Sequence, residues 1–434
     1  MTGQPSRRLI QDQARRSDVD LKHERVCGLL KHLRADAVLF QQPSNIAWIT
    51  AGGDLFRSAS EEPTSSVFLT PDARLFATNS VDSAQIFERE AFGLGFQLKQ
   101  REWFQPHREL VEDLCRGRNV ISDTGVCDTR RTTRAIRDVR HPLTSLEVER
   151  SRMLARIAVH AVEATARHVR TGMTESEVAG QVSHRLLRRT VQPVRIQVCA
   201  DGRSERFRHW AFGEQPVQRY ATISCVARRW GIHLGVTRTV CLDRVPNSLE
   251  QSYRTAAMVH ATGQFFTRAG QPLGEVCKKV QRIYEKFGDG AEWLRSDQAT
   301  VLGYSTADER IWPDSQERLF APAAVFWHPS VGPSMLGDTV LCFDSSNELV
   351  TLSDTWPQIK IRVKGKEVVC PGILLVPTGQ SPLPTVSDSQ SINCLDHPGE
   401  EIPGTVESKW EIQIPSDHPV WTEDSPWSPE SVLE

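Results

Sequence analysis

Three histidines are the residues of this sequence best suited to catalysis or metal binding. His209 stands in "RFRHWAF", His233 in "GIHLGVTRT" and His328 in "AAVFWHPSV". Neutral imidazole is a common zinc ligand, and it also exchanges a proton near neutral pH, as a general acid or base must. Each of these histidines lies in a separate strand-like segment. Histidines arranged in this way are more often hydrogen-bonded pocket or surface residues, so we expect no zinc site from them.

The composition is that of a nearly neutral protein with more than one domain. A chain of 434 residues exceeds a typical single core, which indicates two domains with extra segments. Lys and Arg number 52 against 54 for Asp and Glu, so neither nucleic acid nor a membrane surface is expected as a partner. The ten cysteines form no CxxC pair, and no apolar segment follows the N-terminal arginines. Both features predict a soluble, cytoplasmic protein with reduced thiols.

The first third of the chain alternates helices with strands. Apolar residues at helical spacing predict a helix at about 20–34, and four β-like runs follow it: "DAVLF", "NIAWIT", "SVFLT" and "RLFATN". Helical and strand-like segments continue to alternate up to the strand "NVISD". This order is typical of a layered α/β domain. We expect that domain over residues 20–143, after an N-terminal extension of residues 1–19.

A second domain begins with two well-capped helices. Thr144 is a suitable N-cap for a helix that reaches about residue 169, and Thr174 is a suitable N-cap for the next one. Strand-like runs, a second pair of helices and further strands follow. This order predicts an α+β domain with antiparallel strands over residues 144–377.

The last part of the chain has a different composition. It is rich in Pro, Ser, Asp and Glu, with eleven acidic residues and one lysine after Gln380. Too few apolar residues remain to offset the entropy of ordering such a segment. We therefore expect a disordered acidic tail over residues 378–434.

Four phrases resemble the creatinase, prolidase and aminopeptidase P family, which is the M24 peptidase superfamily. They are "PSNIAWITAGGD", "HPLTSLEVERSR", "VRTGMTESEVA" and "GIHLGVTRT", in the family's order and with its separations. The resemblance covers about residues 20–377. It implies a creatinase N-terminal-like α/β domain of ribonuclease H-like type, followed by an α+β pita-bread domain. It also implies a Xaa-Pro peptidase-like protein that forms a homodimer through its N-terminal domain.

The family's metal ligands are the part of the pattern that this sequence lacks. Family enzymes hold two divalent ions between two aspartates, one histidine and two glutamates, which activate a shared water. The family's second histidine falls at Ile311, and the five ligand positions fall on Ser224, Gly235, Tyr304, His328 and Gly337. Without the carboxylates nothing offsets two divalent charges in a buried pocket. We expect no metal, no cofactor and less than about a tenth of an equivalent of any transition metal in the purified protein.

Two residues that the family uses are retained. His209 matches a histidine that contacts substrate beside the metals, and it could serve as a general base or be left over in a cavity. Arg238 matches a structural ion-pairing residue, and we favour that role. Creatinase works without metal, but its two glutamates fall on Thr237 and Gly337 here. Creatinase activity is therefore not expected.

Three functions stay open on this basis. The first in rank is a non-catalytic pita-bread protein that binds a peptide or a protein. The second is a metal-independent hydrolase or lyase of the prolidase or creatinase type, acting on a small amide or peptide with His209 as its base. The third is a scaffolding subunit that dimerises with a catalytic paralogue. The expected ligand-binding side chains are His209, His233, Tyr304 and His328.

Overall fold

The computed structural model describes residues 12–54, 64–287 and 290–377. Internal contacts divide the chain into two units, Met1–Ser381 and Pro382–Glu434, and all the described residues belong to the first. The predicted acidic tail and most of the predicted N-terminal extension therefore lie outside the described residues. No described helix is long and apolar enough to cross a membrane.

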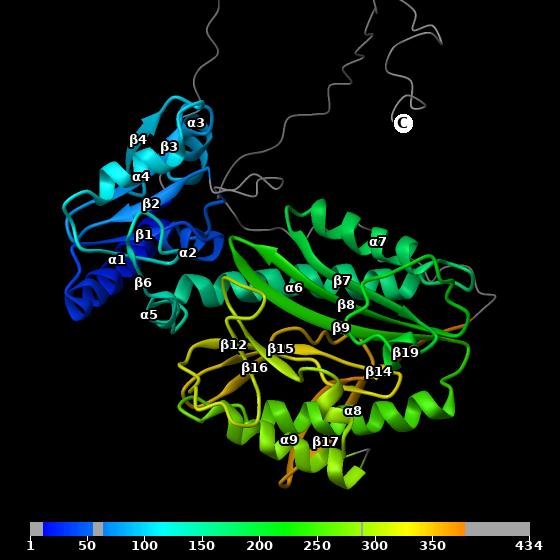
Figure 1. Ribbon diagram of the computed structural model, residues 1–434. Coiled ribbons are helices and arrows are strands. Elements are labelled where there is room, and N and C mark those ends of the chain that lie inside the picture. The colour runs from blue at the N-terminus through cyan, green and yellow to red at the C-terminus, as the bar shows by residue number, and fades with distance from the viewer. Residues whose placement is uncertain (1–11, 55–63, 288–289, 378–434) are drawn as a thin grey trace, which may run out of the picture. The chain divides into compact units, whose positions relative to one another are not determined.

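Six strands form one mixed sheet in the first part of the chain, in the order β4-β3-β2-β1-β5-β6 (Figure 1). β1 pairs antiparallel with β2 and parallel with β5. Its elements, in chain order, are α1 (Gln13–Leu33), β1 (Ala37–Phe40), α2 (Pro43–Ile49), β2 (Ser66–Leu69), β3 (Arg74–Asn79), α3 (Ser83–Gln85), η1 (Ile86–Glu90), β4 (Gln97–Arg101), α4 (His107–Cys115), β5 (Val120–Ser122), β6 (Arg130–Arg131) and α5 (Thr133–Val139).

Two details of this region differ from the sequence-based expectation. The run "NIAWIT" is not a strand, because Pro43 starts the helix α2 and every residue from Asn45 to Ile49 is buried. A helix that is buried on all sides has no polar face and so looks like a buried strand in the sequence. The first helix also begins at Gln13, seven residues before the expected start, where the side chain of Asp12 accepts a hydrogen bond from the backbone N–H of Arg15.

The second part of the chain contains two larger sheets and two pairs of helices. One sheet has the order β19-β9-β8-β7 and the other β11-β10-β12-β15-β16. Its elements are α6 (Ser145–His168), α7 (Glu175–Leu187), β7 (Gln192–Ala200), η2 (Arg203–Glu205), β8 (Tyr220–Arg229), β9 (Ile232–Leu242), α8 (Asn247–Phe266), α9 (Leu273–Phe287), η3 (Glu292–Arg295), β10 (Ala299–Leu302), β11 (Glu309–Arg310), β12 (Ala323–Trp327), β13 (Ser330–Val331), β14 (Ser334–Met335), β15 (Asp338–Cys342), β16 (Asn347–Leu349), β17 (Gln358–Val363), β18 (Lys366–Pro371) and β19 (Ile373–Val376).

The helices α6 and α7 cover one side of these strands, and α8 and α9 cover the other (Figure 1). The expected caps are present, since Thr144 and Thr174 each form a capping box with the glutamate three residues later. The expected antiparallel pairing holds with one exception, because β19 runs parallel to β9. The two sheets meet where the backbone N–H of Thr237 donates to the carbonyl oxygen of Gly337 at 2.9 Å.

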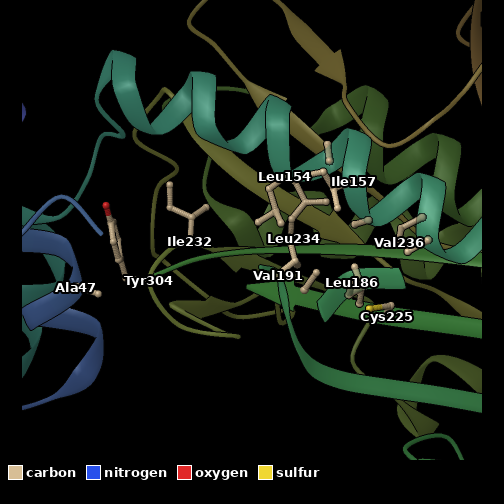
Figure 2. Packing of buried hydrophobic residues seen from close by; sticks show 14 of the residues in the cluster. Ala47, Leu154, Ile157, Leu186, Val191, Cys225, Ile232, Leu234, Val236 and Tyr304 are labelled. Atoms are coloured by element: carbon tan, nitrogen blue, oxygen red, sulfur yellow. The ribbon is translucent and has the colours of Figure 1, made fainter. Parts of the chain in front are cut away.

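The alternation of side chains along β9 separates the core from the other face of the strand. Leu154 and Ile157 of α6 lie over Leu234 and Val236 of β9 (Figure 2). Because successive side chains of a strand point to opposite faces, the residues of β9 that alternate with Leu234 and Val236 face away from α6. This second face carries His233, Gly235 and Thr237, which are also buried.

Buried polar contacts join the two predicted domains within the described residues. Lys22 of α1 forms ion pairs of 2.6 Å with both Asp18 and Glu147, and the hydroxyl of Tyr304 donates to Glu147 at 2.7 Å. Arg140 forms a buried ion pair with Asp308. The boundary at residues 143 and 144 stays a prediction.

Candidate functional site

The face of β9 opposite α6 carries small, uncharged side chains. Gly235 pairs with Val226, and Thr237 pairs with Ser224 on β8. The hydroxyl of Thr237 donates to the hydroxyl of Ser224 at 2.8 Å, and both residues are buried. Because these two hydroxyls hydrogen-bond to each other and carry no charge, they do not offer a binding site for a cation.

The ring of Phe326 fills the space in front of these residues. A Cβ added to Gly235 would lie 2.5 Å from this ring, and one added to Gly337 would lie 2.9 Å from it. Real Cβ atoms do not approach this closely. Phe326 is completely buried. The two glycines are therefore the positions where the backbone must make room for an aromatic ring.

Tyr304 does not lie beside this ring. Its hydroxyl contacts Glu147 and Lys22 instead. On β10 the residue directly opposite Phe326 is Thr300, four residues earlier, and directly opposed residues of an antiparallel pair share a face. Taking Gly303 as the second glycine of the family's Gly-His-x-x-Gly phrase also puts the histidine position on Thr300. The assignment of this position to Tyr304 stays a prediction, and the strand pairing offers Thr300 as the alternative.

His209 and His328 lie together in one small cavity. The imidazole Nε2 of His209 is 3.4 Å from one oxygen of Asp297, and that of His328 is 4.0 Å from the other. The cavity is also lined by Arg195 and Arg208. It has about 10 Å³ for the centre of a water-sized sphere, which is room for a single water. Burial lowers the pKa of His328 to about 4, although Asp297 acts to raise it.

His233 and Tyr304 line a different hollow. It has a volume of about 340 Å³, and its other walls are Arg228, residues 42–44, Ala47 and residues 305–306. The structure therefore brings the four expected ligand-binding residues together in two pairs, in separate cavities. Only the larger hollow has the volume usual for a small-molecule site.

Comparison with known proteins identifies one domain of the chain. Residues 149–326 match the family model Metallopeptidase family M24. The chain contains an M24 domain. No curated protein sequence matches the chain significantly.

Solved structures share the fold of the M24 domain and of the region before it. A Xaa-Pro dipeptidase from Bacillus anthracis aligns with a TM-score of 0.67 at 16% identity, covering 82% of this chain and 100% of that one. A prolidase from Pyrococcus furiosus aligns with a TM-score of 0.64 at 15% identity, covering 76% and 99%. A dipeptidase, PepE, from Mycobacterium ulcerans aligns with a TM-score of 0.68 at 12% identity, covering 85% and 100%. The predicted combination of an α/β domain with a pita-bread domain is confirmed.

The residues present in this M24 domain do not fit a pair of metal ions. The expected ligand positions hold Ser224 on β8, Gly235 on β9 and Gly337 directly before β15, with the Phe326 ring in the space between. No group of three or more His, Cys, Asp or Glu side chains within the described residues is arranged to hold a metal. Ile311, the expected position of the family's second histidine, is buried in the apolar core beneath α8 and α9.

Arg238 has the structural role expected of it. Its fully buried guanidinium forms ion pairs of 3.0 Å with both Glu163 and Asp338, and it donates to the carbonyl oxygen of Thr351. Burial by itself lowers the pKa of this arginine, but the two carboxylates more than reverse the effect and raise it. These contacts tie α6 and β9 to β15.

Another cluster in the M24 domain has the residue types of a nucleophilic triad. His260 lies 3.5 Å from the sulfur of Cys370 and 3.8 Å from Asp338. All three side chains have no exposed surface, and burial raises the pKa of the Cys370 thiol. A protonated thiol that substrate cannot reach is not a nucleophile.

The described cysteines are all free and mostly buried, as predicted, while Cys394 lies outside the described residues.

Sequence reasoning missed the residues that give this site its character. Phe326 of β12 stands two positions before His328, which directly follows the strand, so a period of two continued through His328 would have placed both on one face. Asp297 and Arg195 carry no local signal, because the contact of Asp297 with the two histidines joins segments far apart in the sequence.

The buried His233 gives a testable pH dependence. Its ring hydrogen-bonds the carbonyl oxygen of Gly303 at 3.1 Å, and burial lowers its pKa from 6.5 to about 4. As the pH falls, His233 is therefore protonated in the unfolded chain before it is protonated in the folded protein. The contribution of His233 to the free energy of unfolding is complete above pH 6.5 and is lost progressively toward pH 4. Between pH 7 and pH 5 the loss due to His233 is expected to be about 2 kcal/mol.

Glutamine at this position keeps an N–H donor for Gly303 but does not titrate. His233→Gln is therefore expected to lose about 2 kcal/mol less than the native protein over this pH range, in urea denaturation at pH 7 and pH 5. The exposed His32→Gln is the control and should show the native pH profile. Equal losses in the native protein and His233→Gln would contradict the prediction.

Proposed function

We propose that this M24 protein is a non-catalytic binding protein that takes a peptide or a segment of another protein. The observation that carries the proposal is the Phe326 ring, which fills the space where the two metal-binding acids of the family would project. The family's hydrolysis depends on water activated by two metals. Without the metal-binding acids, and without the space for their side chains, we infer that the fold is kept but the metal-activated hydrolysis is not.

The binding surface that we propose is the segment 203–213, at the mouth of the cavity of His209 and His328. Phe207, Trp210 and Phe212 are 41%, 37% and 44% exposed. Arg203 lies over the rings of Phe207 and Trp210, at 6.0 Å and 4.9 Å. Aromatic and arginine side chains dominate the binding energy of protein interfaces. We call this segment the aromatic rim.

A panel of short peptides tests the aromatic rim. The double variant Phe207→Ser with Trp210→Ser should weaken the tightest-binding peptide about thirtyfold or more, because hot-spot side chains contribute 2 kcal/mol or more. The matched control is Trp103→Ser, whose side chain is 67% exposed and lies far away in the sequence; it should bind like the native protein. Fluorescence anisotropy on EDTA-treated protein measures both. Equal binding by all three proteins would refute the aromatic rim.

Catalysis is the second candidate, and one contact favours it. The contact between His209 and Asp297 has the arrangement of an imidazole oriented by a carboxylate, as a general base requires. The hydroxyls of Ser296 and Ser330, 2.9 Å apart, line the same cavity. Turnover of Xaa-Pro dipeptides or small amides by EDTA-treated protein, lost in His209→Ala, would replace the first proposal with this one. Turnover that needs added manganese or cobalt would contradict both.

The remaining expectations are proposals about assembly and location. We retain a homodimer formed through the N-terminal domain, a scaffolding role beside a catalytic paralogue as the third candidate, and a cytoplasmic location. A sizing column with light scattering separates a dimer from a monomer.

A further inference from the structure

Three buried nitrogen atoms, from residues that line one cavity, have no hydrogen-bond partner within the described residues. They are Nε of Arg195, Nε of Arg208 and Nε2 of His328, and all three residues line the cavity beneath His209. The side chains of Arg208 and His328 are only 6% and 7% exposed. The two arginine nitrogens each carry an N–H, and Nε2 of His328 is a donor when the imidazole proton lies on it. Because a buried donor without a partner is unfavourable, these nitrogens around one cavity indicate a missing acceptor.

The charges around the cavity show which side of it suits an anion. Arg208 already forms an ion pair with Glu292. The carboxylate of Asp297 lies near both histidines, at 3.4 Å from His209 and 4.0 Å from His328. Asp297 also acts on Arg195 through its charge, but no hydrogen bond between them is formed. Arg195 is thus the cation that is least neutralised, and an incoming anion is favoured on its side.

We propose that this cavity binds the carboxylate group of a ligand, with one oxygen accepting from Arg195 and His328. The proposal rests on the proposed function, since it names the chemistry of the group that a ligand on the aromatic rim would insert. The guanidinium of Arg195 is charged, and a hydrogen bond from a charged donor to a carboxylate is stronger than one between neutral groups. The cavity has room for about one water, which matches a single oxygen atom of a carboxylate.

Formate is the smallest probe of this site, and formamide is its uncharged counterpart. Titration calorimetry of the native protein with formate should show saturable binding, whereas formamide should show none. Arg195→Gln should weaken formate binding about tenfold to a hundredfold, which is the effect of losing one charged hydrogen bond. The matched control is Arg228→Gln, a half-buried arginine that lines the other hollow. It should bind formate like the native protein.

Two larger probes separate the sources of the carboxylate. N-acetylglycine mimics a chain end and N-acetylglutamic acid α-amide mimics an acidic side chain, and whichever binds more tightly than formate identifies the source. A second measurement guards against misfolding, because formate should shift the imidazole resonances of His328 in the native protein and in Arg228→Gln, but not in Arg195→Gln.

Two results would overturn the proposal. Formate binding that is absent, or equal in the native protein and Arg195→Gln, would mean that the cavity holds only water. These outcomes are distinguishable from failure of the proposed function, because peptide binding through the aromatic rim is measured with different variants. If the rim double variant loses peptide binding while the native protein binds no formate, the aromatic rim is supported and only the carboxylate site is refuted.

Discussion

Gly235→Asp, which installs the residue that the family uses to hold metal, is expected to destabilise this protein by about 3 kcal/mol or more. The added Cβ would lie 2.5 Å from the ring of Phe326. The carboxylate would be buried among Ser224, Thr237 and Phe326, which carry no charge. Overpacking and the burial of an uncompensated charge act in the same direction. Urea denaturation measures the loss.

A double-mutant cycle shows how much of this loss comes from the contact with Phe326. Gly235→Ala adds only the Cβ and should cost about 1–3 kcal/mol in the native background. In a Phe326→Ala background the ring is absent, so the same substitution should cost less than about 0.5 kcal/mol. A cost that is the same in both backgrounds would show that Phe326 does not occupy the space in front of Gly235.

The same geometry changes the design that would restore a metal centre. The substitutions Ser224→Asp, Gly235→Asp, His328→Glu and Gly337→Glu require Phe326 to be reduced to a small residue as well. We would place the histidine at position 300 in this design, because Thr300 pairs with Phe326 whereas Tyr304 contacts Glu147. Restoration with Tyr304→His and an intact Phe326 would instead break the buried contact between Tyr304 and Glu147.

Arg238→Met is the second substitution for which we expect a large loss, of about 3–5 kcal/mol. Methionine fills a similar volume but removes the cation that Glu163 and Asp338 share, so that among the described residues only one arginine, Arg167 at 3.9 Å from Glu163, remains to pair with either carboxylate. Burial already raises the pKa of Asp338, and Arg238 acts to lower it. Without Arg238 this carboxyl is expected to be protonated at a higher pH still. Chemical denaturation at pH 7 measures the change in unfolding free energy.

A second-site change tests whether stranded charge is the cause. Asp338→Asn in the Arg238→Met background removes the carboxylate that has lost its arginine and should recover part of the loss. The exposed ion pair of Arg152 with Glu348 is the control, because Arg152→Met should cost less than about 1 kcal/mol. Should Arg238→Met be as mild as Arg152→Met, Arg238 would not hold the two sheets together.

The fold could be predicted from the sequence because its signals are local. Thr144 and Thr174 are followed by a glutamate at the third position, so each start of a helix is encoded within four residues. The alternation along β8 and β9 likewise follows from the period of two. The helix α2 escaped prediction because it is buried on every side, which removes the polar face that marks a surface helix.

The sequence by itself predicted a chain that resembles the M24 family and lacks its five metal-binding residues, because that prediction needs only the identity of residues at known separations. Only the tertiary structure decided what replaced them. The Phe326 ring, the cavity of Arg195, Asp297 and His328, and the division of the four expected residues between two cavities depend on contacts between segments far apart in the chain. Packing in three dimensions sets those contacts, and no local pattern in the sequence encodes them.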